Sequence, residues 1–437
     1  MSDDCPVTIV GAGLAGTLLA CALSRAGRRV ELYEKRPDPR MHGQDGGRSI
    51  NLALSVRGLH ALRELGLADE VVKSSILMRG RMIHGRDGSL AFQRYGKDDS
   101  EALHSVSRAG LNLLLVEAAA RYPTVRIHFG HRCTGLDLST SELEFQSGDG
   151  HVSVKSHFIL GADGAYSAVR AAMQRQERFD FSQDYLSHGY KELTIPPGPD
   201  GTFRMESNAL HIWPRGNFMM IALPNTDRSF TCTLFWPFDG PHSFAALTSK
   251  ADVLDYFRDQ FPDAVPLIPD LGLAFLANPT SSLVTVRCRP WHFDGRVAFV
   301  GDACHAVVPF LGQGMNAAFE DCTVLMQCLE RHADRGPALA EYERLRKEHT
   351  DALADMCVEN FVEMRDKVGS PVFRLRKKLQ VFLHALFPRW YLPLYTMIEF
   401  TRIPYANARR RARRQDWIVR VVVTAVLLGL TAMLWWL

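Results

Sequence analysis

The chain has 437 residues, more than one hydrophobic core usually holds, so we expect two domains and further segments. Its apolar content of 46% and charged content of 23% are those of a folded protein and exclude an intrinsically disordered one. The net charge is +3, and without the arginine-rich run 409–414 the rest is slightly acidic, so we expect no nucleic-acid binding. The 9 cysteines include no Cys-x-x-Cys pair, which favours reduced thiols over a disulfide framework or a zinc site.

The first elements are typical of a βαβ unit. A strand at 7–10 is followed by a glycine-rich turn, a helix at 14–25 and a second strand at 30–33 that ends at Glu34. Because the first strand begins almost at the N-terminus, we expect no secretory signal. The next expected elements are helices at 56–65 and 108–121 and strands at 81–84, 90–94 and 125–129.

From residue 189 to residue 236 the pattern changes to short strands between turns that contain Pro, Gly or Asn. We expect these strands to form the antiparallel sheet of a second domain, at 193–195, 210–213, 218–223 and 230–235. A buried strand at 297–300 returns to the first domain, and a helix follows from Met315. After about residue 335 the chain is expected to be mostly helical, with breaks at prolines.

The turn after the first strand contains Gly11-x-Gly13-x-x-Gly16. Gly11 permits the tight turn, Gly13 lets a pyrophosphate approach the backbone, and Gly16 lets the helix pack closely on the strand. Glu34, about twenty residues later, is placed to accept hydrogen bonds from an adenosine ribose. The spacing therefore predicts a dinucleotide-binding turn.

A second motif, Gly301-Asp302, follows the strand at 297–300 directly. A carboxylate at the carboxyl end of the sheet can accept hydrogen bonds from the ribityl hydroxyls of a flavin. Downstream, Gly312 and Gly314 permit close backbone approach before a helix N-terminus, which favours the negative charge of a reduced flavin. This pair of features favours FAD over a nicotinamide cofactor alone.

The third motif is Gly161-Ala162-Asp163-Gly164. It resembles the Asp-Gly motif of flavoprotein hydroxylases, where the Asp organises a loop near the pyrophosphate and the path of the nicotinamide donor. The alternative is a turn that caps the following helix. Arg108, at a helix start, fits either a further FAD contact or a surface salt bridge. The histidines show no His-Glu-x-x-His or other paired spacing, so we expect no metal site.

Together the three motifs resemble those of the class A flavoprotein monooxygenases over nearly the whole chain. Within that class, several stretches resemble the kynurenine 3-monooxygenase family; they are 47–55, 78–84, 188–190, 210–215 and 308–316. The resemblance implies FAD as cofactor, NADPH and O₂ as co-substrates, and hydroxylation of L-kynurenine to 3-hydroxykynurenine through a flavin C4a-hydroperoxide. Such a reaction belongs to tryptophan degradation by the kynurenine pathway, which feeds NAD or quinolinate synthesis.

The resemblance also implies roles for individual residues. The substrate carboxylate would be held by Arg81, Tyr95, Asn360 and Tyr395, and a guanidinium fork matches a carboxylate. The implied FAD-binding residues are Gly11, Gly13, Leu14, Gly16, Glu34, Arg36, Ala53, Arg108, Asp163, Asp302, Gly314, Met315 and Asn316. The loop at the flavin would contribute Pro309, Gly312, Gln313 and Gly314. No acid or base is assigned, because the flavin performs the chemistry. The alternative for Arg81 and Tyr95 is a pair of strand residues that face solvent.

Residues 418–437 differ from the rest of the chain. They contain eleven Ile, Val or Leu residues, and Arg420 is their only charge. A helix of this length would span about 30 Å, so we expect a transmembrane helix whose partner is a lipid bilayer. The arginine-rich run predicts a cytoplasmic catalytic body, at the inner membrane of a bacterium or the outer mitochondrial membrane of a eukaryote. The alternative is a buried terminal helix.

The predicted fold class is α/β, with a discontinuous Rossmann-like FAD-binding domain, a second antiparallel-sheet substrate domain, a C-terminal helical region and a terminal transmembrane helix. The FAD-binding domain is expected at 1–73, 101–178 and 288–335, and the substrate domain at 74–100 and 179–287. The helical region is expected at 336–406, a basic juxtamembrane linker at 407–417 and the transmembrane anchor at 418–437.

Three alternatives to this function stay open. One is a membrane-anchored flavin hydroxylase of another aromatic, such as a quinone precursor. Another is a flavin-binding scaffold without turnover. The third is a nicotinamide-only dehydrogenase, against which the Gly301-Asp302 loop argues.

Overall fold

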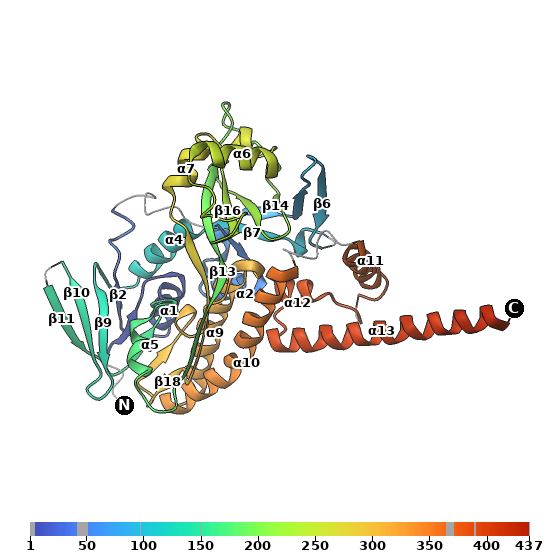
Figure 1. The fold of residues 1–437 in the computed structure, drawn as a ribbon. Helices are drawn as coiled ribbons and strands as arrows, with labels where there is room; N and C mark the ends of the chain where they lie inside the picture. Colours follow the sequence, from blue (N-terminus) through green and yellow to red (C-terminus); the bar gives the residue numbers. More distant parts are fainter. Residues whose placement is uncertain are drawn as a thin grey trace.

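The computed structural model describes residues 5–41, 51–96, 98–148, 150–363, 371–388 and 390–436. Residues 47–50 of the first family-like stretch lie outside these ranges. Figure 1 shows the described chain as a body with two main sheets and one long C-terminal helix.

A six-stranded sheet lies in the lower part of the body in Figure 1. Its order is β18 (His292–Phe293), β19 (Val297–Phe299), β12 (Ile159–Gly161), β1 (Val7–Val10), β2 (Val30–Glu34) and β8 (Val125–Phe129). All neighbours are parallel except β18 and β19. Helices α1 (Leu14–Arg25), α4 (Arg108–Ala120) and α9 (Gly314–Arg331) pack together beside it. Because helices cover parallel sheets, the strands are buried and apolar, and all four residues of β1 are buried. The predicted α/β fold is confirmed.

The other large sheet has seven strands. Its order is β17 (Ser281–Arg289), β13 (Asp180–Ile195), β16 (Phe230–Pro237), β15 (Met219–Pro224), β14 (Ala209–Pro214), β5 (Gly80–His84) and β6 (Leu90–Arg94). The pairs are antiparallel except β14 with β5, which is parallel. Helices α6 (Lys250–Gln260) and α7 (Leu271–Ala277) lie over it (Figure 1). Between them is an aromatic core that includes Trp213, Trp236, Phe257 and Phe275.

Two small sheets and short helices complete the body. One sheet has the order β3 (Asn51–Leu54), β7 (Leu103–Ser107) and β4 (Ile76–Met78), and the other β11 (Gly150–Lys155), β10 (Glu142–Ser147) and β9 (Arg132–Asp137). The short α-helices are α2 (Val56–Glu64), α3 (Ala68–Lys73), α5 (Ala168–Met173) and α8 (Asp302–His305). The 3₁₀ turns are η2 (Asp99–Glu101), η3 (Val265–Leu267) and η4 (Pro309–Leu311).

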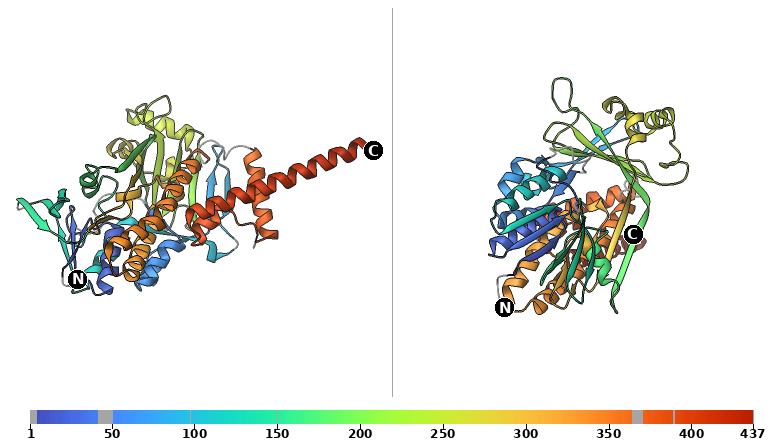
Figure 2. Two further views of the ribbon diagram at one scale, coloured as in Figure 1. Left: turned by 90° about the horizontal axis from the view of Figure 1, so that it is seen from below. Right: turned by 90° about the vertical axis from the view of Figure 1, so that its left-hand side faces the viewer.

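Four helices follow: α10 (Arg335–Val362), α11 (Pro371–Leu386), α12 (Leu394–Phe400) and α13 (Tyr405–Trp436). Helix α10 packs on α9 and on the first part of α13. The rest of α13 extends away from the body in Figure 1 and in the left view of Figure 2. Arg409 of α13 forms an ion pair of 2.7 Å with Asp355 of α10, and Arg410 pairs with Glu348. The basic run predicted as a linker is therefore helical and bound to the body.

The prediction of a transmembrane helix at 418–437 is wrong. In the part of the chain that the structure describes, no helix combines the length and the apolar character that a membrane crossing requires. The apolar residues do not form an element of their own, because α13 begins at Tyr405 and its first turns carry the arginine-rich run. The apolar part is then interrupted by Arg420, Thr424 and Gly429. The prediction counted the Ile, Val and Leu residues and gave these three interruptions too little weight. The bilayer contact expected from this helix is not supported either.

Candidate active site

One cavity of about 490 Å³ joins the predicted motifs. It reaches from the turn after β1 and the loop after β12 to the end of β19 and the face of the seven-stranded sheet. Its lining includes every predicted site residue except Gly16, Gln313, Asn316 and Asn360. The predicted lining residues are Gly11, Gly13, Leu14, Glu34, Arg36, Ala53, Arg81, Tyr95, Arg108, Asp163, Asp302, Pro309, Gly312, Gly314, Met315 and Tyr395.

The glycines of the first turn have distinct surroundings. Gly11 has φ +103°, and a Cβ there would lie 2.5 Å from the carbonyl oxygen of Ala162. A Cβ on Gly16 would lie 1.9 Å from the carbonyl oxygen of Gly11, so this position holds helix α1 against the turn. A Cβ on Gly13 would meet nothing within 4 Å, although Gly13 lines the cavity. The turn therefore leaves open space at the N-terminus of α1, where a pyrophosphate fits.

Glu34 is fixed at the end of β2 by the backbone. Its Oε2 atom accepts a hydrogen bond of 2.8 Å from the amide of Ala12, and Oε1 accepts one of 3.0 Å from the amide of Arg36. Each carboxylate oxygen has a further lone pair, and the residue lines the cavity. This arrangement fits an acceptor for ribose hydroxyls.

Asp163 has both features expected from the sequence, a helix cap and a position beside the cavity. Its Oδ2 atom accepts from the amides of Ala168 and Val169 at the start of α5, at 2.7 and 3.3 Å. Its Oδ1 atom is buried and has no hydrogen-bond partner among the described residues. Burial raises the pKa of this carboxyl, while the hydrogen bonds to it act in the opposite direction. Asp163 thus caps a helix and also borders the cavity with an unsatisfied acceptor.

Asp302 borders the cavity at the end of β19. The turn before it needs a glycine, because Gly301 has φ +64°. Burial raises the pKa of the Asp302 carboxyl, whereas the charges of His305 and Arg108 favour its ionised form. Arg108 lines the same cavity. An acceptor for ribityl hydroxyls and a nearby cation are therefore present together.

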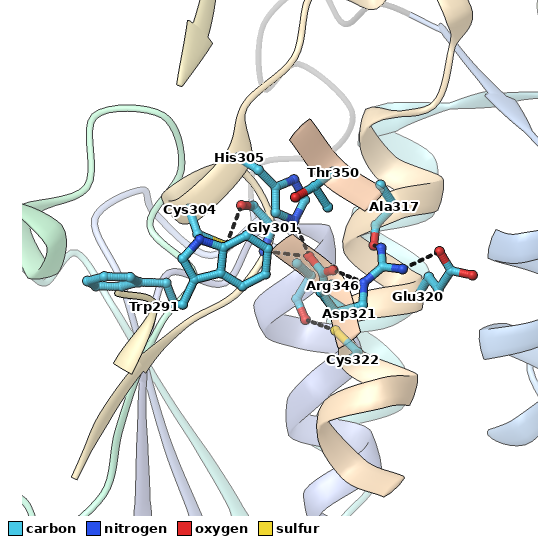
Figure 3. Close-up of polar contacts among 12 residues, drawn as sticks. Trp291, Gly301, Cys304, His305, Ala317, Glu320, Asp321, Cys322, Arg346 and Thr350 are labelled. Atoms are coloured by element: carbon cyan, nitrogen blue, oxygen red, sulfur yellow. Dashed lines mark hydrogen bonds and ion pairs between the residues drawn. The ribbon is translucent and has the colours of Figure 1, made fainter. Parts of the chain in front are cut away.

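A buried polar network holds the Gly301 turn in place (Figure 3). Asp321 of α9 accepts a hydrogen bond of 3.1 Å from the amide of Gly301, and it also pairs with His305. Arg346 of α10 donates from Nε to Asp321 at 2.7 Å and from Nη1 to Glu320 at 2.5 Å. The histidine that follows the Gly-Asp motif thus belongs to the support beneath Asp302.

The loop 309–314 has one side toward the cavity and one side toward the protein. Pro309, Gly312 and Gly314 line the cavity, and Gly312 has φ +65°. Gln313 is fully buried and faces the protein, where its amide donates to Glu399 at 2.7 Å and accepts from the Tyr405 hydroxyl at 2.8 Å.

Asn316, in the first turn of α9, also faces the protein. Its side chain accepts from the amide of Ser55 at 2.9 Å and donates to the carbonyl of Ala53 at 2.8 Å. Asn316 therefore positions Ala53 at the cavity and does not itself line it.

Arg81 and Tyr95 do not face solvent. The Arg81 guanidinium carbon lies 4.6 Å from the ring centroid of Tyr395 and 5.6 Å from that of Tyr95, and the two rings are stacked 5.6 Å apart. The Arg81 Nε atom and the Tyr95 hydroxyl are buried and make no hydrogen bond of good geometry among the described residues, and the two tyrosine side chains interact with the Arg81 charge. Within those residues no carboxylate forms an ion pair with Arg81. A largely desolvated cation without an ion-pair partner is costly, so this end of the cavity favours an anionic ligand.

Asn360 is not among the residues that line the cavity. It comes from α10, and its Nδ2 atom donates a hydrogen bond of 2.8 Å to the carbonyl of Phe310. It therefore supports the loop that lines the cavity, whereas the resemblance implied a direct contact with substrate.

Sequence reasoning missed the apolar wall of the cavity and one buried carboxyl. The wall includes Met78, Leu210, Met219, Ile221, Leu223 and Phe235. Every second residue of β15 contributes to this wall, so the alternation of apolar side chains along the strand could have predicted it. The carboxyl is Glu399, four residues after Tyr395 on α12 and only 1% exposed.

Comparisons with known proteins agree with this geometry. The family model described as FAD binding domain matches residues 4–236 and 277–356. The chain is 50% identical over 416 residues to kynurenine 3-monooxygenase of Myxococcus xanthus, covering 94% of this chain and 89% of that protein. It is 47% identical over 431 residues to kynurenine 3-monooxygenase of Dictyostelium discoideum, covering 96% and 93%.

Solved structures show the same fold. One is 2-methyl-3-hydroxypyridine-5-carboxylic acid oxygenase, with a TM-score of 0.67 at 22% identity, over 84% of this chain and 94% of that chain. Another is p-nitrophenol 4-monooxygenase from Pseudomonas putida, with a TM-score of 0.67 at 18% identity, over 87% and 93%. With the sequence similarities, these findings show that the chain belongs to the kynurenine 3-monooxygenase family of FAD-binding proteins.

Proposed function

We propose that this protein is an FAD-dependent monooxygenase that uses NADPH and O₂ to convert L-kynurenine to 3-hydroxykynurenine, a step of tryptophan degradation. The relatives that match nearly the whole chain are named for this activity. One structural observation carries the proposal: a single cavity joins the FAD motifs to a partly buried arginine that lacks a carboxylate ion-pair partner within the described residues.

The residues that would hold FAD follow the length of the cavity. Gly13 and the N-terminus of α1 would face the pyrophosphate, Glu34 the adenosine ribose, and Asp302 the ribityl chain. Arg36, Arg108 and Asp163 would border the same groups. Leu14, Ala53, Gly314 and Met315 would complete the lining around the cofactor. When bound, FAD would accept the reducing equivalents of NADPH and activate O₂.

The substrate would bind where the cavity meets the seven-stranded sheet. Arg81 would form an ion pair with the α-carboxylate, and the hydroxyls of Tyr95 and Tyr395 would add hydrogen bonds. The ring would lie against the apolar wall formed by residues such as Met219, Ile221 and Phe235. Asn360 would act through the loop carbonyl of Phe310.

The reaction requires the protein to position the substrate and does not require a strong base. The ring amine of kynurenine donates electrons to the ring, so C3 is already nucleophilic. One oxygen atom of O₂ enters the C3–H bond as a hydroxyl, and the other leaves as water at the expense of NADPH and a proton. The chain would hold C3 toward the loop 309–314 and exclude water from the apolar wall.

An aromatic without a carboxylate fits the cavity less well. Such a ligand, for example a quinone precursor that has no carboxylate, would leave the Arg81 charge without an ion-pair partner. The purified FAD-loaded protein should therefore couple NADPH oxidation to a hydroxylated product with L-kynurenine. A panel of aromatics with and without a carboxylate tests this. Equal or better coupling with a carboxylate-free aromatic, or NADPH consumption by none of them, would overturn the proposal.

A further inference from the structure

Glu399 is a buried carboxyl linked to both ends of the site. It follows Tyr395 by four residues on α12, so both side chains lie on one face of that helix. Tyr395 packs over Arg81, and the Oε2 atom of Glu399 accepts the 2.7 Å hydrogen bond from Gln313 in the loop 309–314. One carboxyl thus connects the group expected to bind the substrate carboxylate with the loop expected to face the flavin.

The second oxygen of Glu399 is unusual. The Oε1 atom is buried and has no hydrogen-bond partner among the described residues, and the whole side chain is 1% exposed. An ionised Glu399 would therefore carry charge on an oxygen that nothing solvates, which is costly. A neutral carboxylic acid avoids this cost.

The surroundings of Glu399 contain few charges. The titratable groups that interact with it are Arg81 of β5, Arg57 of α2, Tyr95 after β6, Tyr395 of its own helix, Cys357 of α10 and Tyr405 of α13. Burial raises the pKa of the two central tyrosines, of the Cys357 thiol and of Tyr405, so these groups are neutral near pH 8. Arg57 is already paired with Glu320 at 2.7 Å. Arg81 is therefore the cation near Glu399 whose charge a ligand carboxylate would neutralise.

We propose that Glu399 is a positioning residue that couples the two ends of the cavity, and that it takes up a proton when a substrate carboxylate binds Arg81. The inference depends on the proposed function, which supplies the carboxylate. Without ligand, Arg81 favours the Glu399 anion. With ligand, the bound carboxylate neutralises Arg81 and adds a second negative charge, so the anion of Glu399 is disfavoured. The neutral acid still accepts the hydrogen bond from Gln313 and keeps the loop in place.

The sign of the pH dependence follows. Burial raises the pKa of Glu399 to about 8, and the charges of Arg81 and Arg57 and the hydrogen bond from Gln313 oppose that rise. Ligand binding raises the pKa further. Near pH 6 the residue is already protonated and binding takes up almost no proton. Above pH 8 the free residue is increasingly ionised, so binding takes up more protons than at pH 6 and the affinity falls as the pH rises, by at most tenfold for each pH unit.

The test measures protons taken up by the FAD-loaded protein, by calorimetry in buffers of different ionisation enthalpy. The ligand is desamino-kynurenine, which keeps the carboxylate and ring and lacks the titrating α-amino group. We expect net proton uptake at pH 9 and almost none at pH 6. Glu399→Gln should bind without uptake at either pH. Glu348→Gln, which changes an exposed carboxylate paired with Arg410, should behave as the wild type.

The possible outcomes distinguish a failure of the Glu399 inference from a failure of the proposed function. No uptake by the wild type, or uptake that persists in Glu399→Gln, would overturn the inference while leaving the hydroxylase function intact. Failure of the wild type to bind or hydroxylate kynurenine would instead refute the proposed function itself. Should Glu399→Gln not fold, infrared difference spectra of the wild type at pH 9 decide. Ligand binding must produce a new protonated carboxylic acid band, and its absence contradicts the proposal.

Discussion

The guanidinium of Arg81 on β5 lies over the ring of Tyr395 on α12, with 4.6 Å between the guanidinium carbon and the ring centroid. The two residues come from opposite ends of the chain and meet only through the fold. Their contact places a partly buried positive charge at the end of a cavity whose other end carries the dinucleotide motifs. The account of substrate binding rests on this charge.

Replacing Arg81 by alanine should weaken kynurenine binding by about 2–4 kcal/mol, roughly thirtyfold to several hundredfold in Kd. The reason is that the ligand carboxylate would lose its charged partner in a buried site. FAD content and the flavin absorption spectrum should stay those of the wild type, because the FAD motifs lie elsewhere along the cavity. An equal loss of FAD would show that Arg81 is structural.

Replacing Tyr95 by phenylalanine should have opposite effects on affinity and on stability. Kynurenine affinity should fall by about 1 kcal/mol, roughly fivefold, whereas the Tm should stay the same or rise, because the hydroxyl makes no hydrogen bond of good geometry in the described structure. Tyr342→Phe is the matched control. That hydroxyl donates to the carbonyl of Phe299 at 3.1 Å, so its loss should lower the Tm and leave affinity unchanged. Titrations and thermal melts of both variants check this, and a lowered Tm with unchanged affinity in Tyr95→Phe would contradict it.

The glycine turn offers a pair of substitutions with different outcomes. Gly13→Ala adds a methyl group that meets nothing in the protein but enters the cavity, so the protein should fold and bind FAD at least about tenfold more weakly. Gly16→Ala places its Cβ 1.9 Å from the carbonyl oxygen of Gly11, so it should destabilise the fold itself. Gly135→Ala, with open space in a strand, is the neutral control. FAD titrations and melts measure the difference, and full FAD affinity in a folded Gly13→Ala would refute the placement of the pyrophosphate.

Replacing Arg346 by methionine should destabilise the protein by about 3–5 kcal/mol, because Glu320 and Asp321 would stay buried without their partner. Arg344→Met, which removes an exposed pair of 3.6 Å with Glu341, should change stability by less than about 0.5 kcal/mol. Denaturant unfolding of both variants is the measurement.

The same network should contribute to acid sensitivity. Arg346 and His305 hold the pKa of Asp321 below its ordinary value of 3.8 against the effect of burial. The stability from this pairing is therefore fully present above that pH and is lost as the pH falls through the lower pKa of the folded state. Unfolding free energies measured between pH 6 and pH 3 should fall less steeply in Arg346→Met than in the wild type. An equally steep fall in both would count against the network.

Local patterns predicted the nucleotide-binding half of the fold closely. Strand β1 and helix α1 have the expected bounds, because apolar periodicity and the glycine turn specify them within one stretch of chain. Strand β13 was expected only at 193–195, yet it runs from Asp180 to Ile195. Its first half is largely exposed and acquires its structure from pairing with β17, a distant segment whose contribution no local pattern records.

The site shows the same division. Gly13, Glu34 and Asp302 could be found because each stands at a fixed place relative to a strand end. Glu399 could not, since its burial depends on Gln313 and Arg81 from other parts of the chain. The membrane prediction failed because the count of Ile, Val and Leu overestimated the apolar character of the last part of α13.

The most direct measurement of the central claim is the origin of the new hydroxyl oxygen. FAD-loaded protein would be given NADPH and L-kynurenine under ¹⁸O₂ in ordinary water, and the product analysed by mass spectrometry. We predict 3-hydroxykynurenine with one ¹⁸O atom in the ring hydroxyl, formed in proportion to the NADPH oxidised. NADPH oxidation without a hydroxylated product, or a product oxygen derived from water, would contradict the account.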